Sequence, residues 1–101
     1  MRAKIHLNEN MEEHRRYKIR CAVVGSKPAP VIDWYINDKK IEVSHEIIQK
    51  EEKTVSLLNY VAESEHNGLN ITCKAYNQQM RYDYVQDTVP INVHCKPYRN
   101  S

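Results

Sequence analysis

Cysteine is the residue type of this 101-residue chain with the clearest potential for chemistry, and it occurs three times, at Cys21, Cys73 and Cys95. A thiol can form a disulfide, bind a soft metal ion or act as a nucleophile. An odd number means that one internal disulfide leaves at least one thiol over. The question is which of these roles the surrounding residues favour.

The other reactive residue types give no pattern typical of catalysis or cofactor binding. The five histidines have no metal-site spacing relative to the cysteines, and His94 and Cys95 are adjacent and would face opposite sides of a strand. Two glycines are too few for a phosphate-binding loop. The adjacent Glu51 and Glu52 lie in a polar stretch and are expected to be solvated. We therefore predict no enzyme, no metal and no cofactor.

Composition excludes further classes. The net charge is +2, and Lys and Arg are spread along the chain, so no nucleic-acid partner is predicted. No stretch reaches the roughly 18 apolar residues of a membrane span, so this chain is not expected to insert into a membrane. The N-terminus lacks the apolar segment of a signal peptide. If the protein is extracellular, we expect the sequence to be a fragment of a longer one.

The elements that must position the cysteines are predicted to be β-strands. Apolar and polar residues alternate with period two, and turn residues interrupt the pattern, which is typical of an all-β sandwich. Residues 40–43 form a short strand candidate, whereas 44–53 are weakly patterned, with no more than a turn of helix suggested at 46–53. Pro90 suits an edge or a bulge, because it cannot donate a ladder hydrogen bond. The main predicted strands cover residues 3–7, 17–23, 32–36, 55–61, 69–75 and 89–93.

The register of the strand at 55–61 is ambiguous in the sequence. Val55, Leu57 and Val61 share one parity, while Leu58 and Tyr60 share the other. Either set could face the core.

Cys21, Cys73 and Trp34 all have the apolar parity of their own strands and are therefore expected to point inward. A Cys, a Trp on the next strand and a second Cys well downstream is the arrangement of an immunoglobulin domain. The chain resembles the C2/I-type immunoglobulin domains from Tyr17 to Pro97. The matching segments are Cys21–Pro30, Ile32–Trp34, Cys73–Asn77 and Ile91–Pro97.

This resemblance implies an immunoglobulin-like antiparallel β-sandwich of two sheets, with one intersheet disulfide between Cys21 and Cys73 and with Trp34 packed on the sulfurs. A disulfide that closes so long a loop stabilises by about 4 kcal/mol in the chain-entropy model. The alternative is a reduced pair of core thiols in a cytosolic domain, such as those of muscle filaments. We expect one domain at 1–97 and a linker stub at 98–101.

Within the superfamily, the segment from His66 to Asn77 is similar to the C2-set domains of nephrin, Kirre-type and sidestep-type adhesion proteins. Those relatives are cell-surface receptors of cell recognition. One departure from many immunoglobulin domains is Ile71, which stands where a corner tyrosine is usual, two residues before the second Cys. No tyrosine corner is therefore predicted, which favours the C2-like type.

Cys95 has no partner left if Cys21 and Cys73 pair. Three interpretations stay open: a free buried thiol, a bridge to a neighbouring domain, or an intermolecular bridge that gives a disulfide dimer.

Asn70-Ile71-Thr72 is an N-glycosylation sequon. Asn70 has the outward parity of the strand that carries Cys73, so a glycan there would point to solvent, which agrees with an oxidising compartment. The alternative is an ordinary outward asparagine.

The loop before the last strand combines Met80, Arg81, Tyr82 and Tyr84, residue types that are enriched at the centres of protein interfaces. Tyr35 faces outward from the Trp34 strand and would lie in the same sheet. We take these five residues as the candidate partner-binding surface. The alternative is a solvated hairpin.

The leading hypothesis is an extracellular module of a single-pass adhesion or recognition receptor, which binds another cell-surface or secreted protein of the immunoglobulin type or spaces the binding domains. The alternatives are an intracellular immunoglobulin module of a muscle or cytoskeletal scaffold and a secreted immunoglobulin-type binding protein. The redox state of Cys21 and Cys73 separates the first two.

Overall fold

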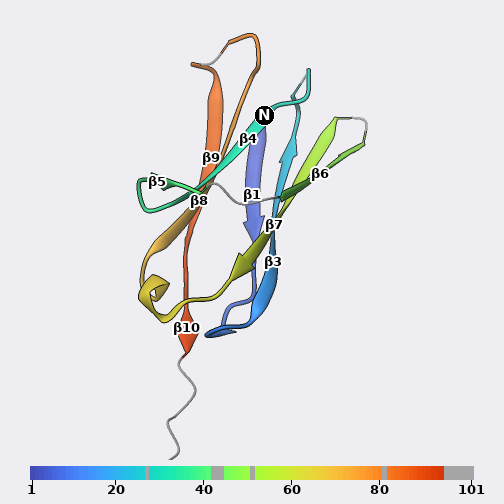
Figure 1. Ribbon diagram of the computed structural model, residues 1–101. Coiled ribbons are helices and arrows are strands. Elements are labelled where there is room, and N and C mark those ends of the chain that lie inside the picture. Colours follow the sequence, from blue (N-terminus) through green and yellow to red (C-terminus); the bar gives the residue numbers. More distant parts are fainter. Residues whose placement is uncertain (27, 42–44, 51, 81, 95–101) are drawn as a thin grey trace, which may run out of the picture.

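The computed structural model describes residues 1–26, 28–41, 45–50, 52–80 and 82–94, with the side chains of 45 and 46 excepted. The chain forms a β-sandwich of two four-stranded antiparallel sheets (Figure 1). The first sheet has the order β1-β3-β7-β6, and its strands are β1 Arg2–His6, β3 Arg16–Val24, β7 Lys53–Val61 and β6 His45–Lys50.

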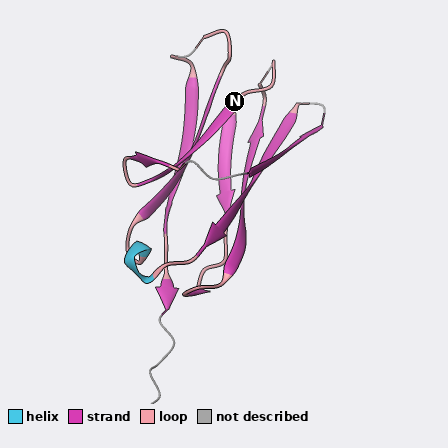
Figure 2. Cartoon of the chain, in the orientation of Figure 1, coloured by secondary structure: helices cyan, strands magenta, loops and turns pink. Residues whose placement is uncertain are grey.

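The second sheet has the order β5-β4-β8-β9 and lies over the first. A separate parallel pair joins β2 to β10, and one short 3-10 turn, η1 (Ser64–His66), links β7 to β8 (Figure 2). The strands of the second sheet and of the pair are β5 Lys39–Lys40, β4 Val31–Ile36, β8 Asn70–Tyr76, β9 Tyr84–Pro90, β2 Met11–Glu12 and β10 Val93–His94.

The predicted fold class is confirmed, and the two sheets are tied across the core. A disulfide joins Cys21 of β3 to Cys73 of β8, with the two Cα atoms 6.4 Å apart, and both residues are fully buried. The Trp34 indole N–H donates a 2.9 Å hydrogen bond to Ser56 Oγ of the facing sheet. A buried indole N–H needs such a partner. The predicted inward parity of Cys21, Cys73 and Trp34 therefore agrees with the structure.

The expectation for residues 44–53 was wrong, because residues 45–50 form strand β6, which pairs with β7. Ile47 and Ile48 are 49% and 46% exposed, so this edge strand leaves about half of each residue in solvent. Its backbone ladder rather than apolar burial holds it, which explains the weak hydrophobic pattern. The strand predicted at 40–43 shrinks to Lys39–Lys40, and residues 42 and 43 lie outside the described part.

The ambiguous strand β7 turns Ser56, Leu58 and Tyr60 inward. The sequence does not reveal this register, because the inward residue Ser56 is polar. Ser56 lies on the core side because it accepts the hydrogen bond from the Trp34 indole N–H. The opposite parity, with Val55 and Leu57, faces outward.

The last predicted strand is divided at Pro90. The edge strand β9 ends there, as Pro90 suggests, and the chain then changes partners. The Ile91 N–H donates to the Leu69 carbonyl at 2.8 Å, and Val93 then pairs in parallel with Met11. Pro90 cannot donate a backbone hydrogen bond, so the change of partner costs no ladder bond at this residue.

Candidate functional site

The candidate surface is the outer face of the second sheet, together with the turn between β8 and β9. Outward positions of β4, β8 and β9 align in rows across this face. The upper row contains Val31, Tyr76 and Tyr84, and the next contains Asp33, Lys74 and Gln86. The β8–β9 turn lies at the end of the sandwich opposite β10 (Figure 1).

Asp33 is the centre of a polar network on this face. Tyr76 Oη donates to Asp33 Oδ2 at 3.0 Å, and Lys40 Nζ lies 3.6 Å from Asp33 Oδ1. The Asp33 side chain is only 16% exposed, so its charge is both shielded and partnered. The network fixes the Tyr76 ring in the upper row and neutralises the only carboxylate among these rows in the described sheet.

Lys74 completes the pairing of charges on this face. Its Nζ lies 4.4 Å from the centroid of the Tyr84 ring, a cation–π arrangement. Lower on the same face, the hydroxyls of Thr72 and Thr88 are hydrogen-bonded at 2.8 Å. The result is an almost neutral surface of paired polar and aromatic groups.

The turn between β8 and β9 is ordered by its own hydrogen bonds. Asn77 Oδ1 accepts from the backbone N–H groups of Gln79 and Met80 at 2.8 and 3.3 Å, which is the bonding pattern of an Asx turn. Asn77 N–H donates to the Asp83 carbonyl at 3.1 Å. The Gln78 amide donates to the Ala29 carbonyl at 2.8 Å and so ties the turn to the loop before β4.

Large side chains project from this ordered turn. Tyr82 is 81% exposed, and its hydroxyl lies 3.5 Å from the Met80 sulfur. Tyr84, at the start of β9, is 49% exposed although it contacts Lys74. A fixed backbone therefore presents apolar and aromatic groups to solvent, which is what a preorganised protein-binding surface needs.

Comparison with known families decides what the domain is. The family model of the CD80-like C2-set immunoglobulin domain matches residues 3–83. The chain is a C2-set immunoglobulin domain. No curated protein sequence matches it.

Solved structures share the fold of this C2-set domain. The mouse nectin-like molecule 4 ectodomain (Ig1–Ig3) aligns with a TM-score of 0.74 at 20% identity, covering 92% of this chain and 33% of that one. Rst D1-D2 gives 0.72 at 23% identity, covering 89% and 48%. The titin M10 complex with obscurin-like 1 gives 0.64 at 16%, covering 95% and 99%. The C2-set domain thus spans about a third and a half of the first two.

The predicted binding residues of the C2-set domain divide into two groups. Met80, Tyr82 and Tyr84 lie together at the β8–β9 turn, and Arg81 lies outside the described residues. Tyr35 shares the face but pairs in register with Thr72, four residues along β8 from the Tyr76 row, a distance of about 13 Å. The structure does not bring Tyr35 to the turn.

Sequence reasoning missed Tyr76 and Lys74, which join the turn to the sheet. A signal was available, since both residues alternate with the inward Cys73 and Ala75 and so must face outward. What the sequence could not provide was the neighbour of each: Asp33 for Tyr76 and Tyr84 for Lys74.

Towards the opposite end of the sandwich, Ile71 occupies the position of the usual corner tyrosine and is fully buried. Tyr60 of β7 holds the η1 turn instead, since its hydroxyl lies 2.7 Å from His66 Nδ1 and the two rings stack at 5.7 Å. Burial raises the pKa of the Tyr60 phenol to about 12, and the nearby Glu63 carboxylate adds to this rise.

Asn70, the predicted glycosylation site, is exposed and pairs in register with Pro90 on the edge strand. Its backbone N–H donates to Asn37 Oδ1 at 3.0 Å, so the side-chain amide is not needed to hold the strand end. Asn70 and Tyr76 lie on the same strand about 20 Å apart.

Among the described residues, no three His, Cys, Asp or Glu side chains cluster as metal ligands would. In the same part of the chain, no helix is long and apolar enough to cross a membrane. Cys95, the third cysteine, lies outside the described residues.

Proposed function

We propose that this C2-set domain is an extracellular module of a cell-surface adhesion or recognition receptor. It would bind another cell-surface or secreted protein, itself of the immunoglobulin type, or set the spacing of neighbouring binding domains. The observation that carries this proposal is the fully buried Cys21–Cys73 disulfide, because such bonds persist in oxidising compartments and are rare in the cytosol.

The binding surface we propose is the β8–β9 turn with the adjoining part of the second sheet. Met80, Tyr82 and Tyr84 are exposed there on a backbone fixed by Asn77 and Gln78. Tyrosine, methionine and arginine are enriched where interfaces bury most of their binding energy, which supports including Arg81 from the sequence. Tyr35 would lie at the edge of this surface.

Alanine substitution tests the surface. We expect Arg81→Ala, Tyr82→Ala and Tyr84→Ala each to weaken binding to a cell-surface partner. The tyrosine nearest the interface centre should cost at least about tenfold in affinity, or about 1.4 kcal/mol. Gln49→Ala, at an exposed position of β6 on the other sheet, is the control and should leave the affinity unchanged. If all three substitutions left partner affinity unchanged, the surface would be rejected and the spacer role would remain.

We further propose that Asn70 carries an N-linked glycan. It is exposed, and about 20 Å separates it from Tyr76, so a glycan would leave the β8–β9 turn free. After expression in a secretory host, a mass increase should map to the peptide with Asn70 and disappear in Asn70→Gln and Thr72→Ala. An unmodified peptide would contradict the assignment.

A second candidate is an intracellular immunoglobulin module of a muscle or cytoskeletal scaffold. The likeness to a chain of the titin M10–obscurin-like 1 complex supports it, because the match covers 99% of that chain. This candidate requires Cys21 and Cys73 to be reduced thiols in the cell. A secreted immunoglobulin-type binding protein would share the disulfide and differ by lacking a membrane anchor.

The domain is proposed to span residues 1–97, with 98–101 as a linker stub. Thiol titration with and without denaturant tests two of the three roles considered for Cys95, while a bridge to a neighbouring domain requires peptide mapping of a longer chain. Reaction only after unfolding would identify a buried thiol, and a dimer that reductant dissociates would identify an intermolecular bridge.

A further inference from the structure

The outer face of the first sheet, which we call the basic face, gathers cations that look dispersed in the sequence. The strands β1, β3 and β7 lie side by side, with β6 at the edge. Alternate residues of these strands point away from the core. The outward positions include seven of the chain's 15 Lys and Arg residues and one histidine. They are Arg2, Lys4, His6, Arg16, Lys18, Arg20, Lys50 and Lys53, all of them exposed.

The described residues provide no ion-pair partner for these cations. Within the described part of the chain, the ion pairs are His14–Glu13, Arg15–Glu12 and Lys40–Asp33, and none includes a member of the basic face. The only acidic residue in the four strands is Glu46, which pairs in register with Leu57. A net charge of +2 for the whole chain thus hides one strongly positive sheet face.

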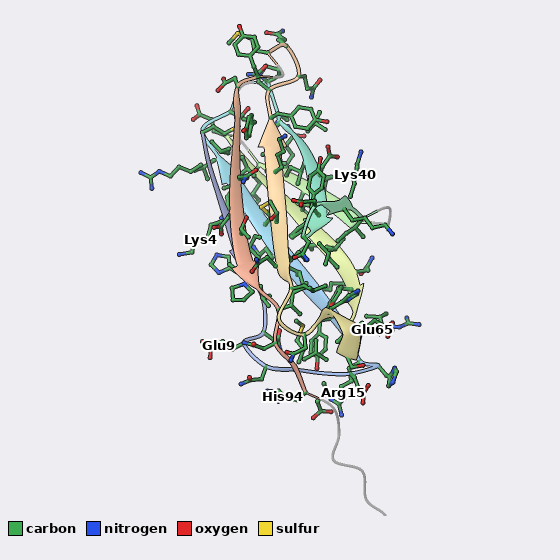
Figure 3. The ribbon with its side chains drawn as sticks, turned by 90° about the vertical axis from the view of Figure 1, so that its left-hand side faces the viewer. Lys4, Glu9, Arg15, Lys40, Glu65 and His94 are labelled. Carbon is green, nitrogen blue, oxygen red and sulfur yellow. A yellow bond between two sulfur atoms is a disulfide. The ribbon has the colours of Figure 1, made fainter. Side chains whose placement is uncertain are left out.

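The cations follow the strands at regular intervals. Arg16, Lys18 and Arg20 occupy successive outward positions of β3, about 6.8 Å apart, and His6 and Lys4 continue the series on β1. Lys4 and Lys40 belong to different sheets and lie at opposite edges of the view in Figure 3. The basic face is therefore a separate surface from the one proposed for protein binding.

Two shallow, mainly apolar hollows interrupt the basic face. One, of about 390 Å³, has an aliphatic floor of Ile48, Val55 and Leu57 and is rimmed by Arg20, Lys50 and Lys53. The other, of about 470 Å³, is lined by Val61, Asn59 and the inward-parity residues Tyr17 and Tyr60, and is rimmed by Arg16 and Lys18. Apolar floors with cationic rims suit a ligand that carries carbon-rich rings and strongly anionic groups together.

We propose that the basic face binds a linear sulfated polysaccharide. Sulfate groups would pair with the lysine and arginine side chains and release counterions, while sugar rings would pack in the apolar hollows. A polyanion that repeats its charge along an extended chain matches cations that repeat along strands.

Composition favours a polysaccharide over the other polyanions. Interfaces with proteins are depleted in lysine and rich in aromatic residues, whereas the outward positions of the described strands on this face contain no Tyr or Trp. Single-stranded nucleic acid is usually held by bases stacked on aromatic rings, so the same lack of outward Tyr and Trp disfavours it as the ligand. Binding to an acidic protein and to a nucleic acid is therefore measured as an alternative in the test.

This inference rests on the proposed extracellular function, because sulfated polysaccharides are encountered outside the cell. The binding measurement itself uses the purified chain and heparin, and does not depend on where the protein resides. Failure of the proposed location and failure of polysaccharide binding are therefore separate results.

The test measures the affinity of the chain for immobilised heparin at about 150 mM salt. Lys18→Glu/Arg20→Glu should weaken binding at least about tenfold and flatten the dependence of affinity on salt. Lys39→Glu/Lys74→Glu is the matched control, since both double variants change the net charge from +2 to −2. The control lies on the second sheet and should bind heparin within about twofold of the parent.

Unsulfated hyaluronan, polyglutamate and single-stranded DNA are the competitors, and each should bind more weakly than heparin. Lys18→Gln/Arg20→Gln provides the same test if charge reversal prevents folding, which the melting temperature reports. The proposal is overturned if the parent does not bind heparin at this salt concentration, or if both double variants lose affinity equally. It is also overturned if polyglutamate or DNA binds as tightly as heparin.

Discussion

The outer face of β5-β4-β8-β9 pairs its charges, whereas the cations on the outer face of β1-β3-β7-β6 have no ion-pair partner among the residues that the structure describes. On the first, Asp33 contacts Lys40 and Tyr76, and Lys74 lies over Tyr84. On the second, cations such as Lys18 and Arg20 have no ion pair among the described residues. Both faces belong to one sandwich with one core.

The difference shows that the fold constrains the inward positions of each strand more than the outward ones. Inward positions must be apolar or internally hydrogen-bonded, as with Cys21, Cys73 and the Trp34–Ser56 pair. Outward positions have no such requirement, so their composition can be set by what the protein binds. Unpaired like charges cost stability through repulsion, and a face that keeps them is a candidate for a ligand that removes the cost.

The largest expected effect comes from cutting the covalent tie between the two sheets. Cys21→Ala/Cys73→Ala removes a bond across 52 residues and should lower the free energy of unfolding by about 4 kcal/mol. Urea denaturation of the variant, and of the parent with reductant, should show the same loss. A variant as stable as the oxidised parent would mean that packing alone holds the two sheets together.

The noncovalent tie should be next in size. Ser56→Ala leaves the buried Trp34 N–H without its acceptor across the core and should cost about 1–3 kcal/mol. Tryptophan fluorescence and urea denaturation measure the change. Ser64→Ala, at an exposed position in the η1 turn, is the control and should have little effect. Equal stability of the two variants would contradict the assigned role of Ser56.

On the paired face, removing a charge should destabilise the protein. Asp33→Asn breaks the ion pair with Lys40 and weakens the bond from Tyr76, for an expected loss of about 1 kcal/mol in the free energy of unfolding. Thermal melting at low salt measures it. A gain in stability would show that the Asp33 network is not a stabilising one.

On the basic face, removing a charge should have the opposite sign and the smallest size. Lys18→Gln should raise stability by a few tenths of a kcal/mol at low salt, because it relieves repulsion from Arg16 and Arg20. The gain should vanish in high salt, where exposed charges are screened. Melting curves of parent and variant across a salt series measure this gain. A loss of stability at low salt would contradict the claim that Lys18 is repelled by Arg16 and Arg20.

Much of this architecture could be predicted from alternation alone. The inward parity of Cys21, Trp34 and Cys73 follows from apolar residues at every second position, and it led to the correct fold class. Strand β6 was not predicted, because an edge strand can be held by its backbone hydrogen bonds while Ile47 and Ile48 stay half exposed. The register of β7 was not predicted, because one of its inward residues, Ser56, is polar.

The two faces could be predicted only in part. Counting Lys and Arg along the sequence suggests an even spread, although Arg16, Lys18 and Arg20 already alternate with inward residues. To place these residues on one face with Lys4 and Lys53, one must know that β1 and β7 flank β3. Local sequence patterns do not predict which distant strands pair. The same limit applies to Tyr76 and its partner Asp33, which lie 43 residues apart in the chain.

The extracellular assignment depends on whether Cys21 and Cys73 are joined in the native protein. Non-reducing peptide mapping by mass spectrometry measures this, on protein freshly isolated from its native source with free thiols blocked at lysis. For an extracellular domain we expect a linked peptide pair that contains Cys21 and Cys73. Blocked free thiols at both positions would contradict an extracellular domain and favour the intracellular scaffold.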